Sequence, residues 1–235
     1  MAERFHVTTP PAAGRAFLEG DEARHLAKVL RGRVGDEVTL FDGRGLEWPA
    51  RIAAIDRDRV ALETGDPRPA EPLPARRVAI GAALPKGDRQ KWMVEKLTEL
   101  GATTLVPLET TRGVAEATAG ARARLERVVI EACKQCGRNT LLEIAEPRSL
   151  DRLLAEVPAG TRLLVAHPGG APIDADGPLA TTADVLALVG PEGGFTAAEL
   201  AAADAAGATR VGLGPHVLRV ETAAIALAAR LAGWR

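Results

Sequence analysis

Cysteine is scarce and long apolar runs are absent in this chain of 235 residues. The two cysteines, Cys133 and Cys136, are too few for the disulfide framework of a small secreted protein. No uncharged apolar run reaches the roughly 18 residues of a membrane span, and residues 1–6 lack the apolar core of a signal peptide. We therefore expect a cytoplasmic protein that makes no membrane contact.

Neither sign of charge is in large excess, since the net charge is −1 and 46% of the residues are hydrophobic, which excludes intrinsic disorder. The charges are nevertheless unevenly distributed. Residues 76–140 contain 12 lysines and arginines against 7 acidic residues, whereas residues 141–235 contain 7 against 11. This asymmetry indicates a localised anion-binding surface, although a merely solvated basic helix face explains it equally well.

A proline-rich segment divides the chain. Residues 66–74 contain four prolines, each of which fixes φ and removes a backbone donor, so we expect an extended connector there. It separates an expected domain of residues 1–68 from one of residues 75–235.

The two expected domains differ in their pattern of elements. Before the connector, a short helix over residues 21–31 precedes strands over 37–41, 48–55 and 59–63, which favours a small β-barrel. After it, strands alternate with helices, which favours a parallel, doubly wound α/β sheet with ligands at the carboxyl ends of its strands. The expected strands cover residues 78–84, 104–108, 162–166, 185–189 and 209–212, and the helices 88–100, 121–136, 150–156, 197–206 and 222–233.

Two glycine-rich loops follow expected strands. Residues 190–194 (Gly-Pro-Glu-Gly-Gly) lead into a helix in which Thr196 and Glu199 have the spacing of a capping box. A plain strand-to-helix connection needs one glycine, so three glycines around Glu192 favour a ligand site with close backbone approach. The second loop, residues 212–222, also precedes a helix. Neither loop has the sequence of a Walker or dinucleotide phosphate loop, so we expect one pocket built mostly of backbone amides and carbonyls.

Residues 190–194 together with residues 213–223 (Leu-Gly-x-x-Val-Leu-Arg-x-Glu-Thr-Ala) resemble the signature of the RsmE family, the 16S ribosomal RNA uridine-N3 methyltransferases of the SPOUT superfamily. Further motifs follow in the family's order, with Asp88 and Val217 as conservative departures from the expected Glu and Ile. These motifs are Arg4-Phe5, residues 25–31, Lys86-Gly87, residues 95–101 and residues 131–138.

The resemblance implies an N-terminal PUA-like β-barrel that helps to bind RNA and a C-terminal α/β domain with a deep trefoil knot. It implies S-adenosylmethionine as the cofactor, no metal, and a homodimer whose active site draws on both subunits. The residues expected to bind the cofactor are Leu188, Gly190, Pro191, Glu192, Gly193, Gly194, Leu213, Gly214, Leu218, Arg219, Thr222 and Ala223. Those expected to bind RNA are Arg4, His25, Lys28, Arg31, Lys86, Arg112, Arg124, Lys134 and Gln135.

The helix over residues 121–136 has two distinct faces. The apolar stripe contains Leu125, Val128, Val129, Ala132, Cys133 and Cys136. The opposite, mainly basic face contains Arg124, Arg127, Glu131, Lys134 and Arg138. The Cys-x-x-Cys pair lies near the helix end on the apolar stripe, so we interpret it as core rather than as a redox or zinc site. In residues 21–31, we expect Leu26, Val29 and Leu30 to pack on the barrel, which leaves Arg24, Lys28 and Arg31 available to phosphates. Arg31 lies six residues after His25, so it is either beyond the helix end or separate in role from His25.

The expected reaction is methylation of N3 of a uridine in 16S ribosomal RNA of the small subunit. N3 lies on the Watson–Crick edge, so the base must be unpaired or flipped out. We expect Arg138 to stabilise negative charge on O2 or O4 of the uracil, and Glu221 or a water to accept the proton. Two alternatives are another SPOUT methyltransferase, such as one acting on a ribose 2′-OH, and a non-enzymatic RNA-binding module of the ribosome.

Overall fold

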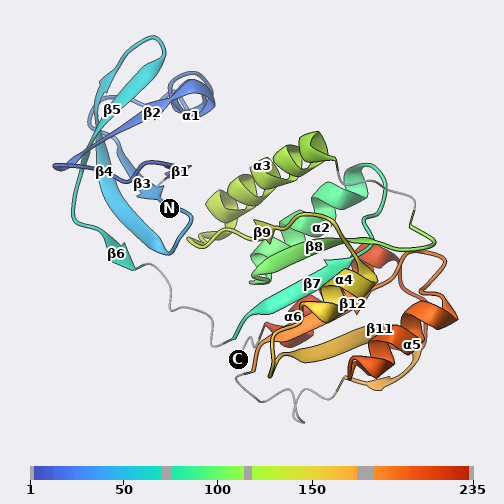
Figure 1. Ribbon diagram of the computed structural model, residues 1–235. Coiled ribbons are helices and arrows are strands. Elements are labelled where there is room, and N and C mark those ends of the chain that lie inside the picture. The colour runs from blue at the N-terminus through green and yellow to red at the C-terminus, as the bar shows by residue number, and fades with distance from the viewer. Residues whose placement is uncertain (1–2, 70–75, 114–117, 174–182, 233–235) are drawn as a thin grey trace. The chain divides into compact units, whose positions relative to one another are not determined.

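The computed structural model describes residues 3–69, 76–113, 118–173 and 183–232. The chain divides into two compact units (Figure 1). The N-terminal unit contains Met1–Leu73 and Ile130–Leu141, and the C-terminal unit contains Pro74–Val129 and Leu142–Arg235. Residues 130–141, which the sequence-based boundary assigns to the C-terminal domain, thus fold with the N-terminal unit.

The N-terminal unit is built on one six-stranded sheet with the order β1-β3-β4-β5-β2, and β6 also pairs with β4. Among the described residues this path does not close between β1 and β2, so the expected small barrel is a half-barrel. Of its strands, β1, β2 and β6 were not predicted, and residues 70–75 of the expected connector region lie outside the described residues. The strands are β1 (Glu3–His6), β2 (Arg15–Glu19), β3 (Glu37–Phe41), β4 (Leu46–Ile55), β5 (Arg59–Thr64) and β6 (Arg68–Pro69).

The helix expected over residues 21–31 is two short elements. Helix α1 (Gly20–Arg24) continues into a π-helical turn, η1 (His25–Val29), and Arg31 lies beyond the helix end with a φ of 54°. Leu26 is buried as expected, but Val29 is 67% exposed and Leu30 is 36% exposed, so their predicted packing on the barrel is wrong. The wider π-turn changes the angular spacing of the side chains, and the apolar stripe calculated for an α-helix is lost.

The C-terminal unit contains a seven-stranded sheet with the order β10-β8-β7-β12-β11-β13, and β9 also pairs with β8. Every pairing in it is parallel, which confirms the predicted α/β class. The pairing of β11 with β13 shifts between Ala166 and Ala171, which both lie opposite Val211. The strands are β7 (Val78–Ala82), β8 (Thr104–Glu109), β9 (Glu143–Ile144), β10 (Arg148–Ser149), β11 (Arg162–Pro172), β12 (Val185–Val189) and β13 (Thr209–Gly212).

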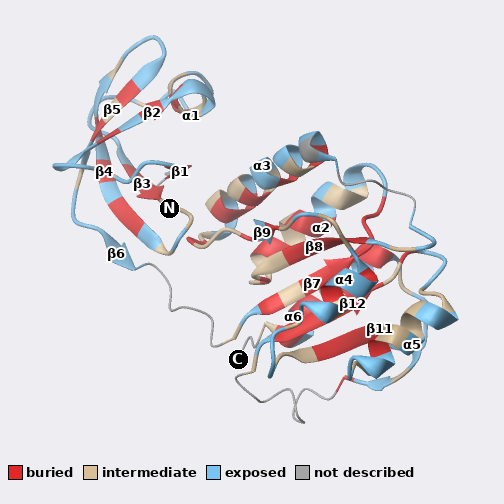
Figure 2. Cartoon of the chain, viewed as in Figure 1, coloured by how far each residue is buried: buried red, intermediate tan, exposed pale blue. Residues whose placement is uncertain are grey.

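Helices cover both faces of this sheet, and all five residues of β12 are buried, as is typical of a strand covered on both sides (Figure 2). Helices α4 (Leu150–Ala155) and α5 (Ala197–Ala205) contact each other, and α4 packs over a core that includes Leu186 and Leu188 of β12. Helices α2 (Asp88–Glu99) and α6 (Val220–Leu231) pack together, and α6 contacts β7 and β12.

Helix α3 (Ala119–Cys136) has the predicted buried stripe over most of its length. Leu125, Val129, Ala132 and Cys133 are buried, whereas Cys136 is exposed. The interpretation of Cys136 as a core cysteine is therefore wrong, because the apolar face is not covered at the last residue of the helix.

Candidate functional site

A cavity of about 400 Å³ opens at the carboxyl ends of three adjacent strands, β12, β11 and β13. This volume lies in the range of about 300–1,000 Å³ that is usual for small-molecule sites. The walls come from residues 166–168 at the turn of β11, from residues 189–195 at the end of β12 and after it, and from seven residues around the start of α6, which are 213, 214, 216–218, 220 and 223. The two glycine-rich loops therefore form one pocket at the sheet edge where parallel sheets bind ligands.

The first loop depends on glycine at two positions for different reasons. Gly194 has a φ of 68°, and its amide donates a hydrogen bond to the carbonyl oxygen of Pro191 (2.8 Å). A Cβ on Gly190 would lie 3.0 Å from the backbone nitrogen of Phe195, so that turn has no room for a side chain. The peptide groups of the loop thus form the cavity wall directly.

The predicted capping box at the start of α5 is confirmed. The hydroxyl of Thr196 accepts from the amide of Glu199 (3.2 Å), and Oε2 of Glu199 accepts from the amide of Thr196 (2.6 Å). Oε1 of Glu199 also accepts from the amide of Thr111 (2.9 Å). Burial of Glu199 raises its pKa, but the hydrogen bonds from Thr196 and Thr111 outweigh burial and hold the pKa below its ordinary value.

The segment after β8 is attached to the first loop as well. Nη1 of Arg112 donates to the carbonyl oxygen of Gly193 (2.6 Å), and a Cβ on Gly193 would lie 3.2 Å from Cδ of Arg112. Arg112, which the sequence interpretation assigns to RNA, is exposed and holds the rim of the cavity.

The second loop leads from β13 into α6, which begins at Val220, two residues before the expected start. Gly214 has a φ of 129°, a conformation that side chains rarely adopt, and Val217 is strongly exposed beside the cavity. The loop therefore adds both backbone and apolar surface to the pocket.

Glu221 combines burial with an incomplete set of partners. It is 4% exposed, and its Oε2 has no hydrogen-bond partner among the described residues. Its Oε1 lies 3.7 Å from Nη1 of Arg89, which also lies 3.6 Å from Oε1 of Glu192. Arg89, in the first turn of α2, thus links the first loop to the start of α6. The sequence reasoning did not single out Arg89, although an arginine in the first turn of the expected helix after a strand is a usable signal.

His167 lines the cavity and was also missed by the sequence reasoning. It follows the regular part of β11, and its Nδ1 accepts a hydrogen bond from the amide of Gly169 (3.0 Å). In the neutral imidazole this places the proton on Nε2. The predicted strand over residues 162–166 ends at this point, so the carboxyl-edge rule would have identified it.

Most residues expected to bind the cofactor line this cavity, while Leu188 lies buried in β12 and Arg219 and Thr222 are exposed outside the lining. Those in the lining are Gly190, Pro191, Glu192, Gly193, Gly194, Leu213, Gly214, Leu218 and Ala223.

The residues expected to bind RNA are divided between the two units. Lys28, Arg31 and Gln135 are exposed and His25 is half-buried in the N-terminal unit, whereas Lys86 and Arg124 are exposed in the C-terminal unit.

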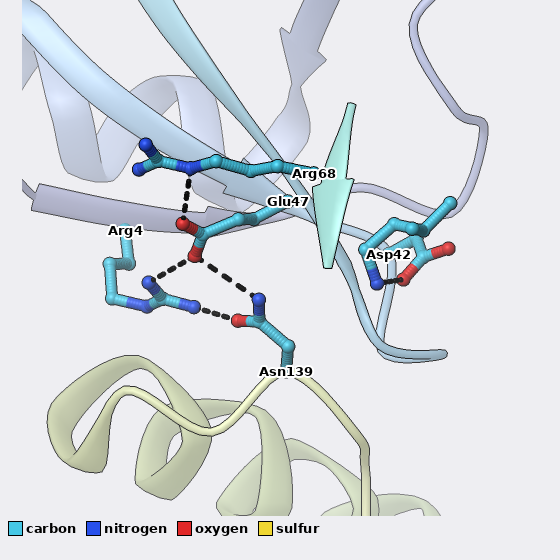
Figure 3. Close-up of polar contacts among 6 residues, drawn as sticks. Arg4, Asp42, Glu47, Arg68 and Asn139 are labelled. Carbon is cyan, nitrogen blue, oxygen red and sulfur yellow. Dashed lines mark hydrogen bonds and ion pairs between the residues drawn. The ribbon is translucent and has the colours of Figure 1, made fainter. Parts of the chain in front are cut away.

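Two of the basic residues expected to bind RNA are engaged inside the N-terminal unit. Arg4 binds Glu47 and Asn139 (Figure 3), and Nζ of Lys134 lies 2.6 Å from Glu22 and 3.0 Å from Glu131. The basic face predicted for α3 therefore loses Lys134 as a free cation.

Arg138, the expected catalytic residue, is 9% exposed and belongs to the N-terminal unit, whereas the cavity belongs to the C-terminal unit. Within the described ranges, no three His, Cys, Asp or Glu side chains are grouped so that they could hold a metal ion. No helix in the described part of the chain is long and apolar enough to cross a membrane.

Comparisons with known proteins match both units. Residues 71–232 match the family described as RNA methyltransferase domain, and residues 18–64 match the RNA methyltransferase PUA domain. Ribosomal RNA small subunit methyltransferase E of Mycobacterium bovis is 36% identical over 235 residues, covering 95% of this chain and 88% of that protein.

Two solved structures have the same fold along nearly the whole chain. The ribosomal RNA small subunit methyltransferase E of Neisseria gonorrhoeae, bound to S-adenosylmethionine, has a TM-score of 0.89 and 29% identity, with 97% and 96% of the two chains covered. A putative methyltransferase of Legionella pneumophila, in complex with the same cofactor, also has a TM-score of 0.89 and 29% identity, with 98% and 97% covered.

Proposed function

This chain belongs to the ribosomal RNA small subunit methyltransferase E family, and we propose that it methylates N3 of a uridine in 16S ribosomal RNA. Family membership makes it an S-adenosylmethionine-dependent RNA methyltransferase with the α/β fold of the SPOUT superfamily and a PUA-like N-terminal domain. What we propose beyond family membership is the target atom, N3 of a uridine. The trefoil knot implied by the resemblance stays a prediction.

The observation that carries the proposal is the cavity shared by the two glycine-rich loops. Its walls are mostly glycine peptides and apolar side chains, with His167, Glu192 and His216 among them, and they suit an adenine and an amino-acid zwitterion better than a triphosphate. Phe195 and Leu218 offer apolar surface, and the peptides of residues 190–194 and 213–214 offer donors and acceptors. Near this pocket, Oε2 of Glu221 is a buried acceptor that no described residue satisfies. These residues fit S-adenosylmethionine.

When bound, S-adenosylmethionine supplies a methyl group already activated as a sulfonium, so the protein must orient the uracil and remove the N3 proton. Arg138 is proposed to stabilise the negative charge on O2 or O4 of uracil as N3 loses this proton. Glu221, through the oxygen that lacks a partner, or a water accepts the proton.

RNA binding is proposed to use exposed cations of both units. Lys28, Arg31, Lys86 and Arg124 are exposed and form no ion pair within the described part of the chain. Such cations contact phosphates without reading sequence. We further propose a homodimer whose active site draws on residues of both subunits, and a cytoplasmic location with the ribosome.

The proposal is tested by mapping the methylated atom. Small ribosomal subunits from cells that lack the enzyme are incubated with the purified protein and S-adenosylmethionine, and the RNA is digested to nucleosides for mass spectrometry. We expect 3-methyluridine. A 2′-O-methyl nucleoside would show another SPOUT activity, and no incorporation into the RNA of any precursor or mature subunit would contradict an enzymatic role.

A further inference from the structure

A buried polar network joins the segment after α3 to the sheet of the N-terminal unit (Figure 3). Asn139 is fully buried, and its Nδ2 donates to Oε2 of Glu47 (3.1 Å). Arg4 donates through Nη1 to the same Oε2 (3.0 Å) and through Nη2 to Oδ1 of Asn139. Arg68 donates to the other carboxylate oxygen, Oε1 (2.9 Å). Arg4, Glu47 and Asn139 therefore form a closed triangle in which each member binds the other two.

The backbone of this segment is held as well. The amide of Gly45 donates to the carbonyl oxygen of Asn139 (3.1 Å), and the amide of Leu141 donates to the carbonyl oxygen of Gly43 (3.0 Å). Gly43 has a φ of 71°, and a Cβ on it would lie 2.7 Å from Cγ of Leu141. Residues 139–141 thus pair with the turn before β4 as a short antiparallel bridge.

The chain is fixed on the other side of Arg138 too. In the last turn of α3, Lys134 pairs with Glu22 and lies over the ring of Phe5, 5.7 Å from its centroid. The helix ends at Cys136, and the next residue, Gly137, has a φ of 83° and an amide that donates to the carbonyl oxygen of Cys133. Arg138 is the single residue between Gly137 and Asn139. Its backbone is therefore clamped from both directions by the N-terminal unit.

Burying these charged and polar groups lowers the stability of the folded protein unless their hydrogen-bond partners are present. Burial raises the pKa of Glu47, but hydrogen bonds from Asn139, Arg4 and Arg68 outweigh burial and hold the pKa below its ordinary value. Removing one partner leaves a charge or a polar group buried without compensation. Nε of Arg4 has no hydrogen-bond partner among the described residues, but the carboxylate of Glu47 and the amide of Asn139 are paired, and paired buried groups of this kind specify a geometry more strictly than apolar packing does.

We propose that Arg4, Glu47 and Asn139 are positioning residues for Arg138. In this inference, which rests on the proposed catalytic role of Arg138, the N-terminal unit does more than bind RNA, because it sets the position of a guanidinium that acts on the target base. Arg4, expected from the sequence to bind RNA, acts through Asn139 instead. Supporting contacts around a catalytic group keep it within a fraction of an ångström of its productive position.

The test compares Asn139→Ala and Arg4→Lys with Arg68→Ala. Lysine keeps an ion pair with Glu47 but lacks the fork that reaches Glu47 and Asn139 together. Arg68→Ala is the matched control, since it removes a cation from the same carboxylate and leaves the triangle intact. Methyl transfer to small ribosomal subunits is measured with kcat expressed per S-adenosylmethionine-binding site, so that unfolded protein does not count. We expect kcat to fall about 10–100-fold in Asn139→Ala and by a smaller factor in Arg4→Lys, with KM for subunits and cofactor affinity unchanged. Arg68→Ala should stay within about 2-fold of the parent, below the fall expected for a small misplacement.

A double-mutant cycle separates positioning from an independent structural role. In an Arg138→Ala background, Asn139→Ala should cause no further loss of kcat, because the group that it positions is gone. Additive losses of kcat in the double variant would overturn the inference. A normal kcat in a folded Arg4→Lys protein would overturn it as well, and this measurement remains available if Asn139→Ala does not fold. An Arg138→Ala protein with normal kcat would instead contradict the proposed function of Arg138 itself.

Discussion

Gly170 of β11 and Gly212 of β13 contact each other backbone to backbone: a Cβ on Gly212 would lie 2.6 Å from the carbonyl oxygen of Gly170. A Cβ on Gly170 would lie 2.4 Å from the carbonyl carbon of Val211. This contact follows the register shift after Ala166, where the chain turns and brings His167 to the cavity. The close packing of two peptides thus sets the wall between the turn of β11 and the second glycine-rich loop.

Gly170→Ala is therefore expected to destabilise the protein strongly. The added methyl group would meet backbone atoms, which cannot rotate away. The unfolding free energy should therefore fall by at least the amount that an overpacked core usually loses, about 1–3 kcal/mol. Gly120→Ala is the matched control, because that glycine lies in α3 with open space around its Cβ direction and alanine favours helix. Urea denaturation measures both. Equal stability of the two variants would show that the contact is less tight than described.

Gly193→Val is expected to reduce the affinity for S-adenosylmethionine at least about 10-fold, equivalent to 1.4 kcal/mol, in a protein that still folds. Gly193 lines the cavity, and a Cβ there meets only the exposed, flexible side chain of Arg112. Calorimetric titration measures the affinity. Arg112→Ala is the control, since it removes the displaced side chain without filling the cavity. Unchanged affinity in the folded valine variant would remove this loop from the site.

RNA affinity is expected to fall with salt, linearly on a log–log plot, by about 0.7–0.9 for each phosphate contact. Arg124→Ala should reduce that slope by one contact, because Arg124 is exposed. Lys134→Ala should leave the slope nearly unchanged and lower the unfolding temperature, because Lys134 is paired with Glu22 and Glu131. Binding titrations at several salt concentrations test both. A slope near zero in the parent would mean that the basic third does not bind phosphates.

Arg138→Ala is expected to lower kcat and kcat/KM together by roughly 10²–10³-fold, as for other lost oxyanion donors, with cofactor affinity unchanged. Arg138→Lys should restore activity only in part, because an ammonium lacks the planar fork of a guanidinium. Steady-state kinetics with small ribosomal subunits provide the measurement. A raised KM for RNA with normal kcat would make Arg138 a phosphate contact.

Glu199 should contribute stability that disappears in acid. Its pKa in the folded protein is below its ordinary value, so its contribution is complete above the ordinary pKa of about 4.3 and is lost as the pH falls through the lowered value. Glu199→Gln should cost about 0.5–2 kcal/mol at neutral pH, as for other lost caps, and less near pH 3. Urea denaturation across this range measures the difference. A constant difference would contradict the capping role of the carboxylate.

The C-terminal unit was predictable because its strands are nearly continuous apolar runs that end in glycine-rich turns. Such runs identify both the parallel sheet and the edge at which β12 and β13 build the pocket. His167 and Arg89 were missed because each contributes a single side chain, without a motif, from a third strand and from a helix start.

The N-terminal unit was less predictable, since its completion depends on contacts distant in sequence. Nothing local to Arg4 indicates that its partner is Asn139, which lies 135 residues away. The charge pattern correctly identified α3 as basic, but it could not show that Glu22 lies against Lys134. Local patterns also assume the α-helical spacing, which fails at the π-turn after Arg24.

The membership of Ile130–Leu141 in the N-terminal unit constrains how the newly made chain can fold. The ribosome finishes β5 at Thr64, yet Arg4 and Glu47 meet Asn139 only after 77 further residues, up to Leu141, have been added. At about 5–20 residues per second, that interval lasts roughly 4–15 s. During that interval the half-barrel is incomplete, and the charges of Arg4 and Glu47, which are largely buried in the finished protein, are still exposed to water. For the same reason, a gene fragment that stops in the proline-rich segment encodes the sheet without residues 130–141, and no single cut separates the two units from each other.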